Sequence, residues 1–251
     1  PDIYSMAKDF GFRGIEVRGL GEEIFAVKAK PFLAENVEET TRQLQKLRLE
    51  IPCLSSGCAL RFADRLVESN GEIRQYIDLA ARLGTPYIRV LGDLTAAPVD
   101  EVDDEAVLAA LKRLAPYAEE KKVTLLVETN GVYTDTARLR ELLDQVCSDY
   151  VAALWDIHHP YRFAGESPEQ TVQNLGAYIK HTHIKDSVMQ DGKVVYRMMG
   201  EGDLPMDAII RALRSINFEG YVTIEWVKRY APDLENPGIV FPQFANFMEQ
   251  Y

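Results

Sequence analysis

The chain has 251 residues, of which 47% are hydrophobic, and a formal net charge of −11. This length and hydrophobic content suit a single domain with one large core, spanning residues 1–251. A surface this acidic argues against nucleic acid and anionic membranes as partners. The sequence has no long apolar stretch or signal-peptide pattern, which leads us to expect a cytoplasmic protein.

Seven short apolar segments predict β-strands, and helical patterns lie between them. Apolar residues at helical spacing predict helices within 70–83, 102–120 and 206–216. The alternation of strands and helices predicts an α/β fold of the TIM (β/α)8-barrel type, with a doubly wound open sheet as the alternative. The predicted strands are GIEVR (14–18), IPCLSSG (51–57), YIRVLG (87–92), TLLVET (124–129), VAALWDI (151–157), YIKHTHI (178–184) and YVTIEWV (221–227).

The beginning of the chain departs from a complete barrel. A helix-like stretch, IYSMAKDFGF (3–12), leads directly into the first predicted strand. Because an eight-stranded barrel needs one strand more than the seven predicted, we expect the first strand of the barrel to be missing from this chain.

Four of the predicted strands deliver metal-ligating side chains to their C-terminal ends, namely Glu128, Asp156, His183 and Glu225. Strand residues two apart share a face, and a parallel barrel forms its active site at the C-terminal ends of its strands. The four side chains therefore predict one divalent metal site at the barrel mouth. Three carboxylates and one imidazole favour Mn²⁺, with Mg²⁺, Co²⁺ and Zn²⁺ as alternatives.

The remaining candidate residues surround this predicted site. Glu128 and Glu225 would flank a bound sugar, one removing the proton α to a carbonyl and the other returning it. The DxxH spacing after Asp156 would bring His159 over the strand end as a substrate contact. His181 is expected to support a metal ligand rather than to bind the metal. Glu16 and Arg89 are expected to form a buried ion pair, and Cys53, Cys58 and Cys147 to be reduced thiols.

The ordered set of motifs resembles the xylose-isomerase-like TIM-barrel superfamily, and within it the sugar phosphate isomerase/epimerase branch. The resemblance covers nearly the whole chain, in the order AKDFGFRGIEVRG, ARLGTPYIRVLGD, LLVETN, ALWDIHH, IKHTHIKD, MMGEGDLPM and YVTIEW. It implies one divalent metal held by Glu128, Asp156, His183 and Glu225, with Glu128 and Glu225 doubling as the acid/base pair. It also implies that the chain isomerises or epimerises a small sugar, sugar phosphate or cyclic polyol through a metal-bound enediolate.

The resemblance extends to residues around the ligands. His159 and Arg197 look like the substrate-binding positions, and Lys185 and Asp186 like a pair that supports the metal histidine, with the carboxylate orienting a ligand. Thr134 stands where the ketose 3-epimerases of this family carry a second carboxylate.

Two alternatives stay open. A metal-dependent dehydratase of the 3-dehydroshikimate or inosose type would need the same metal and base. A non-catalytic sugar-binding barrel is the alternative from a different class. In each case we expect a small carbohydrate as partner, and a homo-oligomer remains open, since Tyr87, Phe218 and Trp226 would supply either interface or core.

Overall fold

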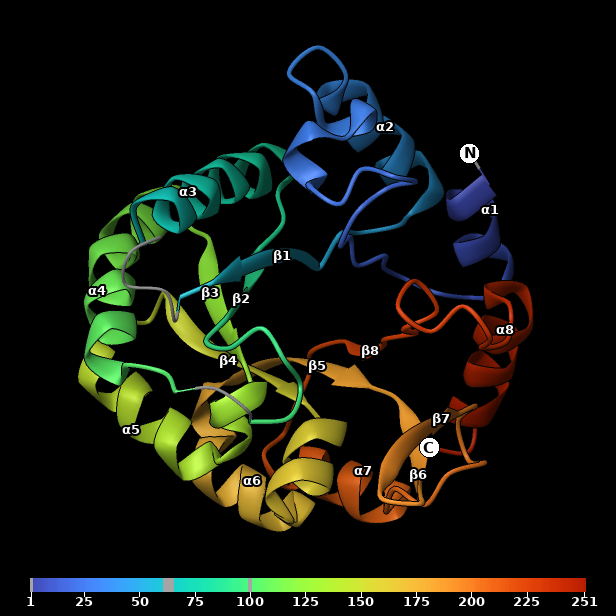
Figure 1. Cartoon of the computed structure of the whole chain (residues 1–251). Coiled ribbons are helices and arrows are strands. Elements are labelled where there is room, and N and C mark those ends of the chain that lie inside the picture. Colours follow the sequence, from blue (N-terminus) through green and yellow to red (C-terminus); the bar gives the residue numbers. More distant parts are fainter. Residues whose placement is uncertain (1, 61–65, 99–100) are drawn as a thin grey trace.

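A curved parallel sheet forms the centre of the computed structural model, which describes residues 2–60, 66–98 and 101–251 (Figure 1). Its strands are hydrogen-bonded in the order β1–β2–β3–β4–β5–β8, and every neighbouring pair is parallel. Each strand overlaps a predicted segment, so the prediction of a TIM-barrel-like α/β fold is confirmed. The strands are β1 (Cys53–Ala59), β2 (Tyr87–Leu91), β3 (Thr124–Glu128), β4 (Val151–Asp156), β5 (Ile179–Ile184) and β8 (Val222–Ile224).

The remaining predicted strand, 14–18, runs beside β1 but is interrupted. It makes two isolated parallel bridges, Gly14 with Glu50 and Val17 with Leu54. Backbone hydrogen bonds join Ile15 N to the Glu50 carbonyl and Ser55 N to the Val17 carbonyl, each at 2.9 Å. Between these bonds lies Pro52, which has no N–H to donate, and we attribute the broken ladder to it.

The barrel is incomplete between β8 and the 14–17 segment. Among the residues that the structure describes, no strand pairs with the outer edge of β8, which confirms the expectation that the first barrel strand is missing. Side chains bridge the opening instead. The Tyr221 hydroxyl donates to Glu50 Oε2 at 2.8 Å, and Arg229 Nη2 donates to the Gly21 carbonyl at 2.8 Å.

Helices form a ring around the sheet (Figure 1). The predicted helices in 70–83, 102–120 and 206–216 correspond to α3, α4 and α7, with bounds that differ by up to four residues. Phe12 stacks on Phe244 at 6.1 Å between ring centroids, which joins the segment after α1 to α8. The helices are α1 (Asp2–Asp9), α2 (Val37–Leu47), α3 (Leu66–Leu83), α4 (Asp104–Lys121), α5 (Thr136–Val146), α6 (Pro168–Leu175), α7 (Met206–Ser215) and α8 (Pro237–Met248). No helix in this described part of the chain is both long and apolar enough to cross a membrane.

An antiparallel hairpin, β6 (Asp186–Gln190) and β7 (Lys193–Arg197), follows β5 and was not predicted. Its turn is Asp191–Gly192, and both residues have positive φ, at 49° and 72°. A two-residue Asp-Gly turn between alternating residues is a strong hairpin signal, so the sequence did contain the information that would have revealed it.

The interior of the barrel changes from apolar to polar along the strands. Leu126, Ala152 and Leu154 form a buried cluster toward the N-terminal ends, with Tyr87 packed against it. Two residues further along their strands come Glu128 and Asp156, because inward-facing positions alternate. The polar side chains thus form a layer at the C-terminal ends of the strands, where such barrels form their sites, and the apolar cluster fills the interior next to this layer.

Candidate metal centre and active site

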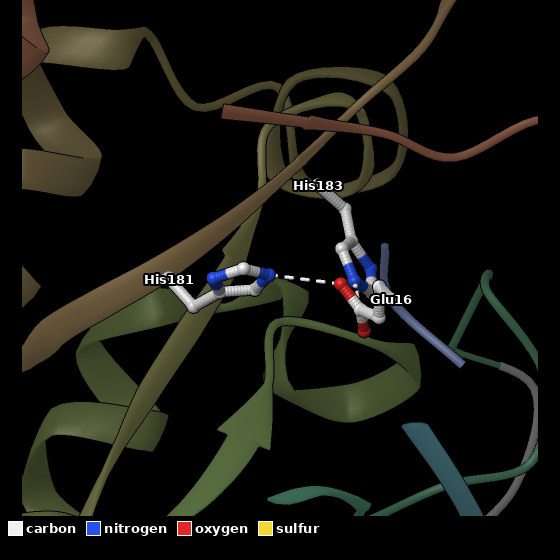
Figure 2. A group of neighbouring side chains, drawn as sticks. All are labelled: Glu16, His181 and His183. Atoms are coloured by element: carbon white, nitrogen blue, oxygen red, sulfur yellow. Dashed lines mark hydrogen bonds and ion pairs between the residues drawn. The ribbon is translucent and has the colours of Figure 1, made fainter. Parts of the chain in front are cut away.

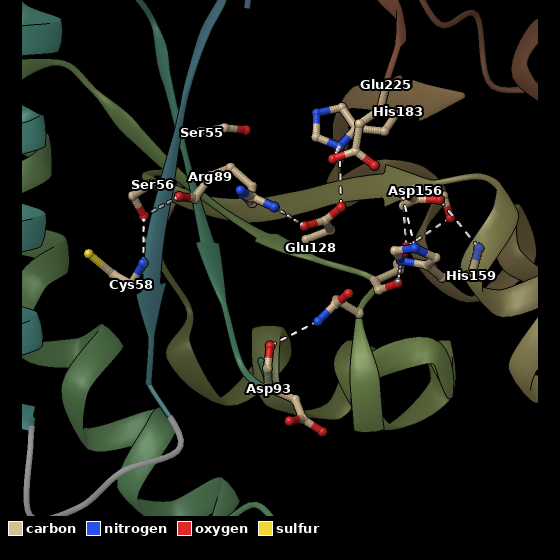
Figure 3. Close-up of polar contacts among 12 residues, drawn as sticks. Ser55, Ser56, Cys58, Arg89, Asp93, Glu128, Asp156, His159, His183 and Glu225 are labelled. Atoms are coloured by element: carbon tan, nitrogen blue, oxygen red, sulfur yellow. Dashed lines mark hydrogen bonds and ion pairs between the residues drawn. The ribbon is translucent and has the colours of Figure 1, made fainter. Parts of the chain in front are cut away.

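The four predicted metal ligands meet at the C-terminal mouth of the barrel (Figure 3). Glu128 ends β3, Asp156 ends β4, His183 lies in β5, and Glu225 directly follows β8. One ligand atom from each lies within 4.8 Å of the others. The register explains the meeting, because Asp156 pairs with His183 across β4 and β5, and the Glu225 amide donates to the Ile184 carbonyl at 2.9 Å.

Two buried cations lie among these carboxylates. Arg89 Nη1 donates to Glu128 Oε2 at 2.6 Å, and both side chains are less than a tenth exposed. The ammonium of Lys185, 1% exposed, contacts both Asp156 Oδ2 and Glu225 Oε2. Lys185 therefore lies against two candidate ligands.

The two candidate acid/base residues are held ionised. Burial alone would raise the pKa of Glu128, but the Arg89 guanidinium and then His183 hold that pKa well below its ordinary value. Burial likewise opposes ionisation of Glu225, whereas Lys185 and then His183 lower its pKa. Both glutamates can therefore accept a proton at neutral pH.

His183 and His181 are joined by a carboxylate from the far side of the barrel. Glu16 Oε1 lies 2.9 Å from His183 Nε2, and Glu16 Oε2 lies 2.8 Å from His181 Nε2. On its other side, His183 Nδ1 faces Glu128 Oε1 at 3.2 Å and Glu225 Oε1 at 3.8 Å. Burial opposes protonation of His183, but Glu16 and then Glu128 raise its pKa well above the ordinary value.

The prediction that Glu16 and Arg89 form an ion pair with each other is wrong, because each has other partners. Both side chains face the interior, but Arg89 contacts Glu128 and Glu16 contacts the two histidines. The reason is the strand order: β2 adjoins β3, so Arg89 lies beside Glu128, whereas the 14–17 segment faces β5 across the interior. Arg89 occupies an inward-facing position of the buried YIRV strand, and this was the signal in the sequence for a buried ion pair in the interior.

His159 lies where the DxxH spacing predicted, beside Asp156. Its Nε2 is 3.4 Å from Asp156 Oδ2, and its Nδ1 is 3.2 Å from the Thr129 carbonyl. Burial lowers the pKa of His159, so the ring is neutral near pH 7. His158, for which the sequence suggested no role, bonds Ser187 Oγ through Nε2 at 2.9 Å; with Asp156 and His159 it forms another group whose ligand atoms lie within 4.8 Å.

Arg197 and Asp186 lie apart from the four candidate ligands. The Arg197 guanidinium donates to the Tyr196 carbonyl at 3.2 Å. Tyr196 faces the His158 ring at 5.7 Å, and neighbouring strand residues point to opposite faces, so Arg197 points away from the site. The position of Arg197 gives no support to the expected substrate contact. Tyr196, which the sequence analysis did not single out, lies on the side that faces the site.

The Asp186 carboxylate organises the turn before α7 instead of orienting a metal ligand, which corrects the expectation for it. Its oxygens accept backbone N–H bonds from Gly200 at 3.0 Å, Gly202 at 2.9 Å and Leu204 at 3.4 Å. A side chain at position 202 would collide with it, since a Cβ there would lie 1.9 Å from Asp186 Oδ1. The GEGDLP stretch is therefore a turn built around this carboxylate.

The residues of the site fit a divalent cation. With neutral imidazoles, as coordination requires, the contacting network leaves two uncompensated negative charges. One divalent ion would neutralise them and relieve the repulsion among carboxylates that share a site. The network comprises the carboxylates Glu16, Glu128, Asp156 and Glu225 and the permanent cations Arg89 and Lys185.

Comparison with known sequences identifies the same kind of barrel. The family model for the xylose isomerase-like TIM barrel matches residues 5–243. Fructoselysine 3-epimerase of Shigella flexneri is 25% identical over 239 residues, which cover 89% of this chain and 84% of that protein. Inosose dehydratase of Clostridium perfringens is 24% identical over 156 residues, which cover 55% of this chain and 52% of that protein. The match thus spans about half the length of the inosose dehydratase.

Solved structures show the same fold at lower identity. The probable 3-DHS dehydratase AsbF of Bacillus anthracis superposes with a TM-score of 0.79 at 19% identity, covering 99% of this chain and 92% of that one. An L-ribulose 3-epimerase superposes with a TM-score of 0.77 at 18% identity, covering 98% of this chain and 86% of that one. At these identities the likeness establishes the fold alone.

Proposed function

Because this chain belongs to the xylose isomerase-like TIM-barrel family, we propose that it is a divalent-metal-dependent isomerase or epimerase. The substrate class would be a small sugar, sugar phosphate or cyclic polyol. The observation that carries the proposal is the meeting of Glu128, Asp156, His183 and Glu225, whose ligand atoms lie within 4.8 Å of one another. The fructoselysine 3-epimerase relative, matched over 84% of its length, supports a carbohydrate substrate.

These same four residues would hold the cation, with Mn²⁺ the favoured ion from the oxygen-rich ligand set and Mg²⁺, Co²⁺ or Zn²⁺ as alternatives. When bound, a divalent ion supplies Lewis-acid polarisation of a substrate carbonyl or hydroxyl oxygen. His159, neutral and beside Asp156, would hydrogen-bond a substrate hydroxyl next to that position.

Glu128 and Glu225 would perform the proton transfers. They come from β3 and from the end of β8, and β4 and β5 lie between these strands in the sheet, so the two carboxylates approach the site from different sides. One would remove the proton from the carbon next to the carbonyl, and the other would return a proton to the same or the adjacent carbon. Arg89 and Lys185 would keep both carboxylates ionised between turnovers, because each donates to one of them. The glutamate that returns a proton would therefore first take one up from water or from a substrate hydroxyl.

A dehydratase is the second candidate, favoured by the inosose dehydratase relatives and by Thr134. The same base would remove the α-proton, and a β-hydroxyl would then take up that proton from the base and leave as water. Because residue 134 is a threonine, this position offers no carboxylate to a sugar. The Thr134 side chain is buried, and its hydroxyl donates to the Gly131 carbonyl at 2.8 Å. This departure weakens the case for a ketose 3-epimerase in particular.

The test is turnover of ketosugars and inososes in D₂O by metal-depleted protein to which Mn²⁺ is restored. Deuterium entering the carbon next to the carbonyl without loss of water supports an isomerase or epimerase, and loss of one water supports the dehydratase. Glu225→Gln should abolish both. Glu166→Gln is the matched control, since Glu166 accepts three hydrogen bonds from Thr136 and Thr171 instead of serving the site. Sugar binding without proton exchange would instead identify a non-catalytic barrel, and failure to bind any divalent ion would contradict the proposal.

A further inference from the structure

Glu16 occupies a position that the proposed reaction does not use. It belongs to the interrupted 14–17 segment, and its side chain reaches into the interior between His181 and His183 (Figure 2). Its side chain is 8% exposed. Both carboxylate oxygens are engaged, because Oε2 contacts His181 Nε2 at 2.8 Å, and Oε1 contacts His183 Nε2 at 2.9 Å and the Ser55 hydroxyl at 2.5 Å.

The protons in this cluster can be placed by hydrogen-bond chemistry. An ionised carboxylate only accepts, so each Nε2 that contacts Glu16 must carry a hydrogen. His181 Nδ1 is buried without a hydrogen-bond partner among the described residues. A hydrogen there would be a buried donor without a partner, so the ring hydrogen of His181 lies on Nε2, where Glu16 accepts it. Two imidazole N–H groups thus converge on one carboxylate.

This arrangement selects which nitrogen of His183 can bind a metal. With Nε2 donating to Glu16, Nδ1 keeps its lone pair when the ring is neutral. Nδ1 is also the nitrogen that faces the other candidate ligands, at 3.2 Å from Glu128 Oε1 and 3.8 Å from Glu225 Oε1. A carboxylate on the second nitrogen of a metal-bound histidine fixes its tautomer and orientation and makes it a stronger ligand.

We propose that Glu16 is a positioning residue that fixes Nδ1 of His183 as its metal-binding atom and thereby tightens the metal site. His181 and Ser55 hold Glu16 in place by donating to it. The inference rests on the proposed function, since it requires that His183 bind a metal. The same cluster has a second possible use, in which Glu16, His181 and His183 themselves bind an ion, because their ligand atoms also lie within 4.8 Å of one another. The experiments distinguish this use from the proposed one.

The first experiment is a calorimetric titration of metal-depleted protein with Mn²⁺, which needs no substrate. We expect wild type to bind one equivalent and Glu16→Gln to bind about 10- to 100-fold more weakly. Glu166→Gln, which also neutralises a carboxylate that accepts several hydrogen bonds, should match wild type. Unchanged affinity in Glu16→Gln, or a second equivalent in wild type that is lost in this variant, would overturn the inference.

The second experiment reads the nitrogen directly, by long-range ¹H–¹⁵N NMR of the imidazoles in Zn²⁺-loaded protein. The chain has four histidines, so single-histidine variants suffice to assign the spectrum. We expect His183 to carry its hydrogen on Nε2 and the metal on Nδ1 in wild type, and the Nε2 signal to shift in Glu16→Gln. A merely structural Glu16 would lower stability without moving this signal.

The wild-type spectrum decides the question even if Glu16→Gln does not fold, because metal on Nε2 of His183 would exclude the proposed role of Glu16. Wild type that binds one equivalent through Nε2 contradicts this inference and leaves the proposed function intact. Wild type that binds no divalent ion contradicts both.

Discussion

Replacing Arg89 with methionine would leave the Glu128 carboxylate buried without its guanidinium partner. The two groups are 2.6 Å apart, and their side chains are 8% and 2% exposed. At this distance the Coulomb attraction in an effective dielectric constant of about 20 is about 6 kcal/mol. Desolvation of the pair offsets part of that attraction, and removal of one partner from a buried pair typically costs about 3–5 kcal/mol. His183 Nδ1 remains 3.2 Å from Glu128, so we expect the lower half of this range.

The assay is thermal unfolding in the presence of a chelator, so that no metal compensates the unpaired charge of Glu128. A loss of about 3–4 kcal/mol corresponds to a decrease in Tm of roughly 6 to 16 °C for a protein of this size. Arg89→Lys keeps a charge and should lose less. Arg42→Met breaks a pair in which both side chains are more than half exposed, and should change Tm by no more than about 2 °C.

The double variant Arg89→Met/Glu128→Gln removes both charges and should recover most of the lost stability, because position 128 then carries no buried charge that lacks its partner. A Tm of Arg89→Met within about 2 °C of wild type would refute the reasoning. So would a double variant no more stable than Arg89→Met. In the active protein, the pKa of Glu128 should rise when Arg89 is removed, so the acid limb of the pH profile of kcat/KM should move to higher pH.

Further predictions concern catalysis, metal binding and thiol reactivity. Glu128→Gln and Glu225→Gln should each abolish exchange of the substrate proton with D₂O while far-ultraviolet circular dichroism stays unchanged; wild-type rates in either would exclude the two-base mechanism. His183→Ala should lower Mn²⁺ affinity at least about tenfold in a titration, and unchanged affinity would remove His183 from the ligands. Iodoacetamide at pH 8 should modify the exposed Cys147 first, because Cys58 is buried and burial raises its pKa to about 12; mass spectrometry that finds Cys58 modified first would contradict this.

The order of the elements and the positions of the four candidate ligands were open to prediction from the sequence because both depend on local patterns. Val- and Ile-rich segments alternate with helical spacing, and this pattern predicts parallel strands with crossover helices. Parity within a strand then gives the inward positions, and the rule that barrel sites form at C-terminal strand ends brings Glu128 and Asp156 to one mouth. The opening beside β8 was predictable by counting strands.

The partners of the buried charges were decided by the tertiary structure. Glu16 and His181 are 165 residues apart in sequence, and no local pattern encodes their contact. Arg89 was assigned to Glu16 when its neighbour is Glu128, because sequence alone does not say how far each side chain reaches across a closed interior.

The sequence by itself therefore determined the kind of barrel and the candidate ligands at its mouth, through periodicity and strand-end position. The tertiary structure decided which nitrogen of His183 faces those ligands, that Tyr196 and not Arg197 faces the site, and that Asp186 organises a turn. The physical reason is that hydrogen bonds and ion pairs act over a few ångströms. Their partners are known only when strand register, sheet curvature and the hairpin after β5 have set the distances.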